Sequence, residues 1–235
     1  PKSEKVIDVE AGYQYDGSNW HAGANFYYMD YDNQLVQTGE TSDIGEALTT
    51  NVKDSYRMGV ELTAGWAPLS WLSVEGNAAL SQNKIKDFDE YVDNWDGDAL
   101  KIHYDNSTLS YSPSAILNGF IDLHYAGFSA TWHTNFVSSQ YLDNSESKDR
   151  SLPCYSQSDL SLNYQTNVAK KLGIKQMIFG FDINNIFNRH YAASGSVWYN
   201  AVSQSAGYTQ DHRLSAISYI PMAGTTFMTH LTLKF

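Results

Sequence analysis

The chain has 235 residues, of which 42% are hydrophobic and 14% aromatic, and its formal net charge is −11. The negative charge and the lack of a basic stripe argue against a nucleic-acid partner, and no apolar run approaches the ~18–20 residues of a membrane helix. Cys154 is the single cysteine, so no internal disulfide can form. The chain starts at Pro1 without a signal peptide, which indicates either processing or a piece of a longer protein.

Alternation of apolar and polar residues with a period of two predicts nine β-strands. In the last one, Phe227, Leu231 and Leu233 fall on one side, while His230 and Lys234 fall on the other. In chain order, the predicted strands span residues 7–15, 20–28, 56–66, 72–81, 117–125, 128–136, 160–165, 177–184 and 227–235. No segment shows a helical stripe, so the sequence predicts an all-β fold.

Short and long connections alternate along the chain. The short ones are residues 16–19, 67–70, 126–127 and 167–174, and the long ones are 33–53, 83–111, 142–153 and 188–224. An antiparallel up-and-down meander places all long connections at one edge, as in outer-membrane barrels with short periplasmic turns and long extracellular loops. A soluble sandwich, the alternative, usually has Greek-key connections.

The two faces of the predicted strands differ in charge. Formal charges gather in the polar series, at Glu10, Arg57, Glu61, Glu75, Asp122, Asp182 and Lys234. We expect this face, with His21, His124, His133 and His230, to line the interior, and Phe179, Phe181 and Leu231 to face lipid. Cys154 begins a predicted strand on the apolar series, which indicates a lipid-facing or rim thiol.

Aromatic residues gather at the strand ends, at Tyr13, Tyr15, Trp20, Tyr28, Trp66, Trp71, Tyr125 and Tyr141. Amphipathic rings at these heights favour an interfacial girdle, although carbohydrate-binding modules also have Tyr-rich strand ends. An odd number of strands cannot close a conventional bacterial barrel, and an open sheet would leave unpaired edges in lipid. The sequence therefore predicts part of a larger transmembrane β-barrel.

Several segments carry a family resemblance that covers essentially the whole chain. VIDVEAGYQY with FYYMDYDNQL, then DSYRMGVEL, FGFDINNIFNRHY and the terminal LTLKF, resemble the barrel strands of TonB-dependent outer-membrane receptors in this order. The resemblance implies a barrel of about 22 strands, of which residues 1–235 would be the C-terminal part. An N-terminal plug domain and an energy-coupling segment would precede Pro1.

The resemblance also implies a function. Such receptors sit in the outer membrane of Gram-negative bacteria and import scarce nutrients with energy supplied through TonB, commonly a ferric siderophore, cobalamin or a glycan. The expected partners are outer-membrane lipid, the plug, TonB and the ligand, with no cofactor. The terminal Phe235 would belong to the signal read by the barrel-assembly machinery, or would simply be an aromatic residue at the rim.

Other functions are weighed against this one. No GxSxG, HExxH or CxxC motif occurs, so the sequence does not favour an enzyme. A passive porin or adhesin barrel and a soluble β-sandwich binding module remain alternatives. Conductance would favour the porin, and solubility without detergent would favour the sandwich.

Two long connections contain candidate binding residues. Residues 83–111 carry clustered carboxylates, of which Asp93, Asp96 and Asp98 are a weak calcium candidate, with a solvated acidic loop as the alternative. Residues 188–224 carry Trp198, Tyr199, Tyr208, His212, Arg213 and Tyr219. This aromatic and basic mixture fits contact with an aromatic, anionic iron chelate, and fits packing between loops equally well. Trp198, Tyr199 and Arg213 are the candidates for direct contact.

Overall fold

The computed structural model describes residues 2–41, 44, 46–167 and 173–235, except for the side chains of residues 38–41, 47, 198 and 199. Its strands are β1 (Lys5–Asp16), β2 (Trp20–Thr41), β3 (Ala47–Leu69), β4 (Leu72–Asn94), β5 (Leu100–Thr108), β6 (Ala115–Tyr125), β7 (Phe128–Val137), β8 (Gln140–Tyr141), β9 (Ser151–Leu152), β10 (Tyr155–Thr166), β11 (Gln176–Asn184), β12 (Ala192–Val202), β13 (Leu214–Pro221) and β14 (Thr226–Lys234). One 3-10 turn, η1 (Lys148–Arg150), precedes β9. No helix in the described ranges is long and apolar enough to cross a membrane.

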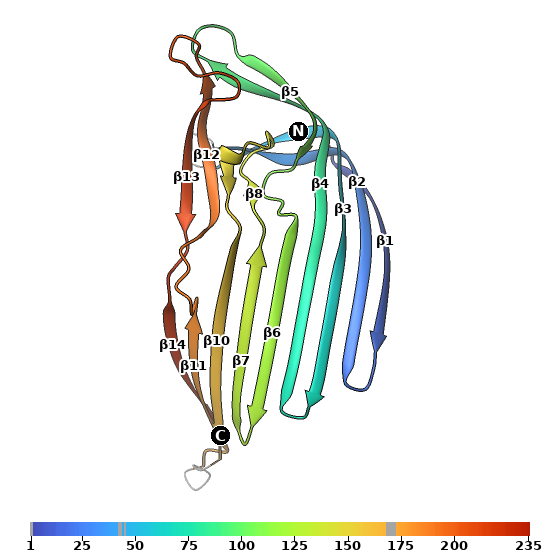
Figure 1. The fold of residues 1–235 in the computed structure, drawn as a ribbon, viewed down its shortest axis with the longest axis vertical. Helices are drawn as coiled ribbons and strands as arrows, with labels where there is room; N and C mark the ends of the chain where they lie inside the picture. Colours follow the sequence, from blue (N-terminus) through green and yellow to red (C-terminus); the bar gives the residue numbers. More distant parts are fainter. Residues whose placement is uncertain (1, 42–43, 45, 168–172) are drawn as a thin grey trace.

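Nine of the described strands form one antiparallel path, in the order β1-β2-β3-β4-β6-β7-β10-β11-β14 (Figure 1). Each strand pairs with the one before it in the path, which confirms the predicted meander. The sheet is an open, curved wall. A second sheet, which a sandwich would need, does not face it in the described part of the chain: the remaining strands join the upper end of the wall or form the small β8–β9 pair.

Tight turns close the lower end of the wall. Between β6 and β7 the turn consists of Ala126 and Gly127, whose φ angles are 50° and 84°. Two central residues with positive φ give the hairpin turn whose twist matches that of the strands. A Cβ at Gly127 would lie 2.5 Å from the carbonyl oxygen of Gln165, so only glycine fits there. The β10–β11 connection contains residues 168–172, which lie outside the described residues.

The polar series occupies the hollowed face of the wall. Three hollows, of about 240, 380 and 580 Å³, are lined by polar-series side chains, among them His21, Glu75, Glu10, Glu61, His124 and His230. Polar side chains bond along this face, for example Asn25 Nδ2 to Glu10 Oε2 at 3.0 Å. The predicted interior face is therefore the one with polar contacts and hollows.

Two interior histidines pack against glycines of the neighbouring strand. A Cβ added at Gly65 would lie 2.1 Å from His21 Cε1, and one at Gly180 would lie 1.9 Å from His230 Cε1. The His230 ring also lies 3.7 Å from an Asp182 carboxylate oxygen. These rings therefore occupy space left by a missing side chain, which is a packing role.

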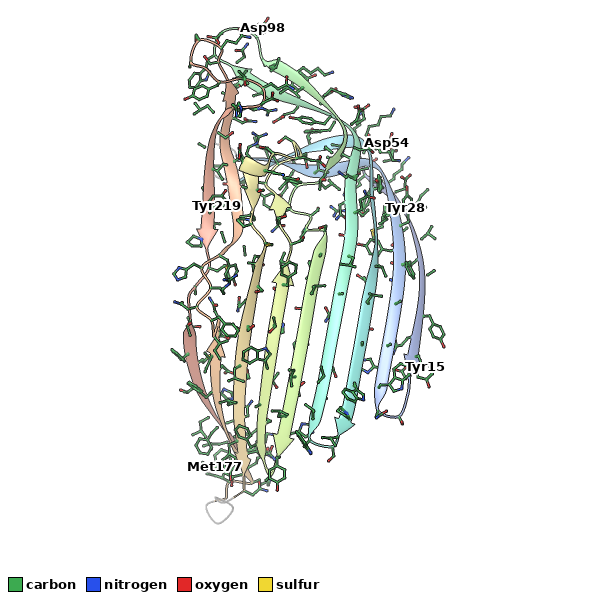
Figure 2. All side chains as sticks on the ribbon, in the orientation of Figure 1. Tyr15, Tyr28, Asp54, Asp98, Met177 and Tyr219 are labelled. Atoms are coloured by element: carbon green, nitrogen blue, oxygen red, sulfur yellow. The ribbon has the colours of Figure 1, made fainter. Side chains whose placement is uncertain are left out.

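The opposite face is apolar and open. Val9, Phe26, Trp66 and Leu231 are each more than half exposed. Aromatic side chains occur at two heights: Tyr15 and Trp20 stack with ring centroids 4.6 Å apart near the lower end, and Tyr28 lies near the upper end (Figure 2). A continuous apolar surface of this extent needs a cover, and lipid is the cover that we propose below.

Three of the four long connections are strands rather than the loops that the sequence had indicated. Most of residues 33–53 continue β2 and β3, residues 83–111 contain the β4–β5 hairpin, and residues 188–224 contain β12 and β13. Alternation fails to predict the β2–β3 tip because the polar Gln34 lies on the buried face, 6% exposed, and the apolar Leu35 lies on the open face, 47% exposed. We call residues 33–53, 83–111, 142–153 and 188–224 the upper segments, and all four lie at the same end of the wall, as expected (Figure 1).

Two single residues that the sequence singled out lie just outside strands. Cys154 is a free, exposed thiol that lies just before β10 instead of within the strand. Phe235 follows β14 and is 73% exposed, while its carbonyl oxygen accepts a hydrogen bond from Lys175 Nζ at 2.9 Å.

Candidate functional site

The candidate binding residues lie where two hairpins from distant parts of the sequence meet. The tip of β4–β5 reaches across the upper end of the wall to the tip of β12–β13 (Figure 1). There β12 pairs in parallel with β4, with Ala201 opposite Asp93 and Val202 opposite Asn94. The Trp95 amide also donates to the Val202 carbonyl oxygen at 3.1 Å. The strands β13, β12, β4 and β5 therefore form one mixed sheet above the meander.

Apolar contacts hold the upper segments together. Val92 and Ile102 of β4–β5 bury Val202 of β12. The β2–β3 tip joins the same hairpin through a cluster of Val36, Val52, Ile85, Phe88 and Leu109. A third cluster, formed by Leu142, Leu152 and Val197, ties residues 142–153 to β12. The largest fully buried apolar side chains of the described chain belong to these clusters, so its apolar core lies in the upper segments.

A buried ion pair crosses the junction between the two hairpins. Arg213 Nη1 donates to both carboxylate oxygens of Glu90 at 2.9 Å, and Arg213 Nη2 donates to the Tyr104 hydroxyl at 2.7 Å. The Tyr104 hydroxyl in turn donates to Glu90 Oε2 at 2.8 Å, and Asn200 Nδ2 donates to Glu90 Oε1 at 3.0 Å. Only 4% of the Arg213 side chain and 16% of the Glu90 side chain are exposed. We call these four residues the hairpin clasp.

The electrostatics of the hairpin clasp follow from its burial. Burial and the neighbouring Glu90 carboxylate raise the pKa of Tyr104 to about 12, so this phenol stays neutral and can donate. Burial alone would lower the pKa of Arg213, but Glu90 and Tyr104 raise it by more. The guanidinium therefore stays charged at physiological pH, with its charge matched inside the protein.

The segment 142–153 is held by a second buried pair. Arg150 Nε donates to Asp143, and both residues are largely buried. Asn144, 1% exposed, accepts from the Ser110 amide at 2.8 Å and donates to the Gln37 carbonyl oxygen at 2.9 Å. This segment thus joins the β2–β3 tip to the residues that follow β5.

The structure places the predicted ligand-contact residues in different surroundings. Arg213 is enclosed in the hairpin clasp, which fits the packing alternative, so direct ligand contact by Arg213 stays a prediction that requires the clasp to open. Tyr208 is half-buried and lies edge-on to Trp95, with ring centroids 6.5 Å apart. His212 is exposed at the tip. Trp198 and Tyr199 lie on β12, with side chains outside the described part.

Two further candidates from the sequence have contacts of their own in the structure. The Tyr219 hydroxyl donates to the Ser151 carbonyl oxygen at 3.3 Å, so it ties β13 to β9. Asp93, Asp96 and Asp98 are all exposed. Asp96 accepts from the Ser205 hydroxyl at 2.5 Å across the two tips, which is a structural contact between the hairpins.

Among the described residues, the group with metal-ligand spacing is a different one, Asp87, Asp89 and His103 on the β4–β5 hairpin. His103 Nδ1 lies 3.0 Å from Asp89 Oδ1, and Nε2 lies 3.2 Å from Asp105 Oδ1. Hydrogen bonds to Asp89 and Asp105 raise the pKa of His103. Asp93, Asp96 and Asp98, the weak calcium candidate from the sequence, thus do not form a group with metal-ligand spacing. The group that does form lies on the strands of the β4–β5 hairpin, in a segment that the sequence predicted to be a loop.

Comparison with known proteins agrees with this architecture. The family described as "TonB dependent receptor-like, beta-barrel" matches residues 2–186. The chain belongs to this family. TonB-dependent receptors are outer-membrane transporters and not enzymes, in agreement with the absence of catalytic motifs. Among curated proteins, no sequence matches this chain.

Solved structures of TonB-dependent receptors share the fold. The ferric-catecholate import receptor Fiu from K12 E. coli has a TM-score of 0.64 and 17% identity, and covers 100% of this chain and 28% of its own. The copper transporter OprC has a TM-score of 0.65 and 20% identity, over 97% of this chain and 32% of its own. The ferric yersiniabactin uptake receptor FyuA from Yersinia pestis has a TM-score of 0.63 and 16% identity, and the similarity covers 99% of this chain and 30% of FyuA. The chain thus spans about a third of the length of these receptors.

The sequence pointed to Arg213 but not to its three partners in the hairpin clasp. Glu90 is one of the clustered carboxylates of residues 83–111, and nothing in the sequence marks it, Tyr104 or Asn200 as a partner of Arg213. No local signal connects Glu90 to Arg213, which lies 123 residues further along the chain. The alternation of Phe88, Glu90 and Val92 with Asp87, Asp89 and Tyr91 was the available signal, because it predicts a strand with Glu90 on the apolar side.

Proposed function

We propose that this chain is the C-terminal part of the barrel of an outer-membrane receptor that imports a scarce nutrient with energy from TonB, and that the nutrient is a ferric siderophore. In this proposal, residues 1–235 form a wall with lipid on its apolar face. A plug domain that precedes Pro1 fills the interior. The observation that carries the proposal is the combination of a nine-strand meander, apolar on one face and polar on the other, with large packed hairpins at one end only.

The upper segments are the proposed extracellular vestibule. Binding residues are commonly placed on connections that a rigid scaffold holds, and here the connections are themselves packed into one body by three apolar clusters. Tyr208 and His212 at the β12–β13 tip are proposed ligand contacts, together with Trp198 and Tyr199 on β12. The family relatives support the ligand class only by analogy: Fiu imports ferric catecholates and FyuA takes up ferric yersiniabactin.

The test is transport by the full-length receptor in cells that lack other siderophore receptors. Uptake of ⁵⁵Fe bound to a panel of siderophores is measured with and without TonB. Uptake that requires both the receptor and TonB supports the proposal. Uptake without TonB, or salt conductance of open-pore size, would favour a passive porin. TonB-dependent uptake of cobalamin or a glycan, with no iron uptake, would keep the transporter and replace the ligand.

Deletion of residues 195–215 is a poor test of ligand contact, although it is the obvious one. It would remove both Arg213 and Val202, and would leave Glu90 buried without its cation. Single changes at the β12–β13 tip are cleaner. His212→Ala and Tyr208→Ala should lower ligand affinity while the barrel stays resistant to heat in detergent. Unchanged affinity in both variants would show that this tip is packing only.

A further inference from the structure

An interior hollow of about 380 Å³ lies on the polar face of β1–β4, next to the upper segments. Its floor is made by small residues: Gly59 and Ser81 are opposite each other in one row of the sheet, and Ala79 lies in the next row. Tyr27 occupies the same row as Gly59, and a Cβ at Gly59 would lie 2.7 Å from the Tyr27 hydroxyl. The Tyr27 ring thus covers the space left by the missing side chain of Gly59, and the small side chains of Ala79 and Ser81 leave the recess beside it.

Arg57 lies at the upper row of this hollow, between Met29 of β2 and Asn83 of β4. Its hydrogen bonds to other described residues come from Nη1 alone, to Asn83 Oδ1 and to Ser112 Oγ, both at 3.3 Å. Both acceptors are neutral. No described carboxylate lies within ion-pair distance of the guanidinium, and its Nε and Nη2 groups have no acceptor among the described residues.

Five cations of the upper segments provide a contrast, whereas the exposed Lys53, Lys148 and Arg189 form no ion pair with a described carboxylate. Ion pairs with carboxylates are made by Lys84, Lys86, Lys101, Arg150 and Arg213, at 3.2 Å or less. Arg213, expected from the sequence to meet an anionic ligand, is therefore matched inside the protein. Arg57 is half-buried, lines a hollow and keeps its outer donors free. A guanidinium presents a planar fork that matches the two oxygens of a carboxylate, a catecholate or a phosphate.

We propose that Arg57 is the anion-binding residue of the receptor interior, and that it holds a negatively charged oxygen group of the imported ligand. This deepens the proposed function, on which it rests, by assigning an anionic chelate as the substrate class. Glu10 and Glu61 line the lower rows of the same hollow. They would repel an anion placed lower. Asp8 lies in the upper row, but on β1 with Met29 of β2 between it and Arg57, so the favourable position for the charged oxygens is beside Arg57.

The first test is binding by the full-length receptor of two iron chelates of different charge. A ferric tris-catecholate carries three negative charges, and a neutral ferric tris-hydroxamate carries none. Arg57→Gln should weaken binding of the tris-catecholate about ten- to hundredfold, which is the usual weight of hydrogen bonds to a charged group. Binding of the neutral chelate should change by less than threefold. Arg57→Lys should restore part of the affinity. Equal loss for both chelates, or no loss for either, overturns the proposal.

Arg189→Gln is the matched control, because Arg189 is an exposed arginine of the upper segments that lies outside this hollow. It removes the same charge and should leave both affinities unchanged. An equal effect of the two variants would mean that only the overall charge matters, and would also overturn the assignment of Arg57.

A second test separates the ligand from the receptor's own carboxylates as the source of the anion. Arg57→Cys in a Cys154→Ser background is treated with a membrane-impermeant thiol reagent on intact cells. Rapid labelling that the bound tris-catecholate slows supports the ligand site. A thiol that stays closed without ligand, together with a less stable receptor in the Arg57→Gln variant, indicates a carboxylate of the preceding domain and overturns the proposal. If the receptor binds neither chelate, the ferric-siderophore function fails, and the access of the thiol alone decides whether the recess is open.

Discussion

Arg213 offers a direct test of the hairpin clasp, because its removal leaves a buried charge without its cation. In the Arg213→Met variant the apolar stem is largely kept, while Glu90, 16% exposed, loses its two hydrogen bonds of 2.9 Å. Removing one partner of a buried pair costs about 3–5 kcal/mol. Tyr104 and Asn200 still donate to Glu90, so we expect the lower end, about 3 kcal/mol, which is about a hundredfold in the opening equilibrium.

The measurement is hydrogen exchange of the full-length receptor, followed by mass spectrometry on peptides from residues 87–105 and 198–215. Exchange in both peptides should rise about a hundredfold in Arg213→Met, while peptides from β6 and β7 stay unchanged. The double variant Glu90→Met/Arg213→Met should recover most of the protection, because replacing both partners by apolar residues is often neutral. Unchanged exchange in Arg213→Met, or a double variant as unprotected as the single one, would refute the reasoning.

Three further outcomes are expected. Phe181→Arg should abolish the heat-resistant folded barrel, since arginine at the membrane midplane costs ~2–4 kcal/mol. Asn184→Arg, on the opposite face, should be better tolerated, and equal tolerance of the two variants on denaturing gels would contradict the lipid-facing assignment of Phe181. Cys154 should react slowly with a membrane-impermeant, charged maleimide on intact cells, and rapid labelling would leave only an exposed rim position for it. Burial raises the pKa of Glu146, but its hydrogen bonds to Lys84 and Thr108 lower it by more, to below the usual 4.5. The stabilising effect of Glu146 is thus present above pH 4.5 and is lost as the pH falls through the lowered pKa. Hydrogen exchange of residues 142–153, corrected for intrinsic rates, should therefore rise less steeply in acid in the Glu146→Gln variant than in the native protein.

The meander could be read from the sequence because water and an apolar environment impose a period of two on the strands of the wall. In β14, Phe227 and Leu231 alternate with His230 and Lys234, and the pairing of Phe179 with Leu231 keeps both on one face. The order of apolar and polar residues along a single strand is enough to predict which side chains share a face. The faces, the nine strands of the path and the common edge of the long connections follow from it.

The upper segments could not be predicted in the same way, for two physical reasons. At the β2–β3 tip the buried face carries the polar Gln34 and the open face carries the apolar Leu35, so the alternation of apolar and polar residues gives no clear signal. Where a face is buried, its cover comes from another part of the sequence, as when Val202 covers Val92. The candidate site depends on these distant contacts. Sequence reasoning therefore selected Arg213 as a residue with a role, but could not distinguish a ligand from Glu90 as its partner.

The parallel pairing of β12 with β4 has a consequence for engineering and for sequence divergence. Because binding residues are commonly carried by such connections, one surface segment grafted from a relative would be a direct way to exchange ligand specificity. Here a graft of residues 188–224 alone would bring a new edge to β4 and a new counterpart to Glu90, while a graft of residues 83–111 alone would leave Arg213 unmatched. A functional chimera should require both hairpins from the same parent. Homologues should accordingly change at positions 90 and 213 together, so that these two stretches of the sequence are inherited as one unit.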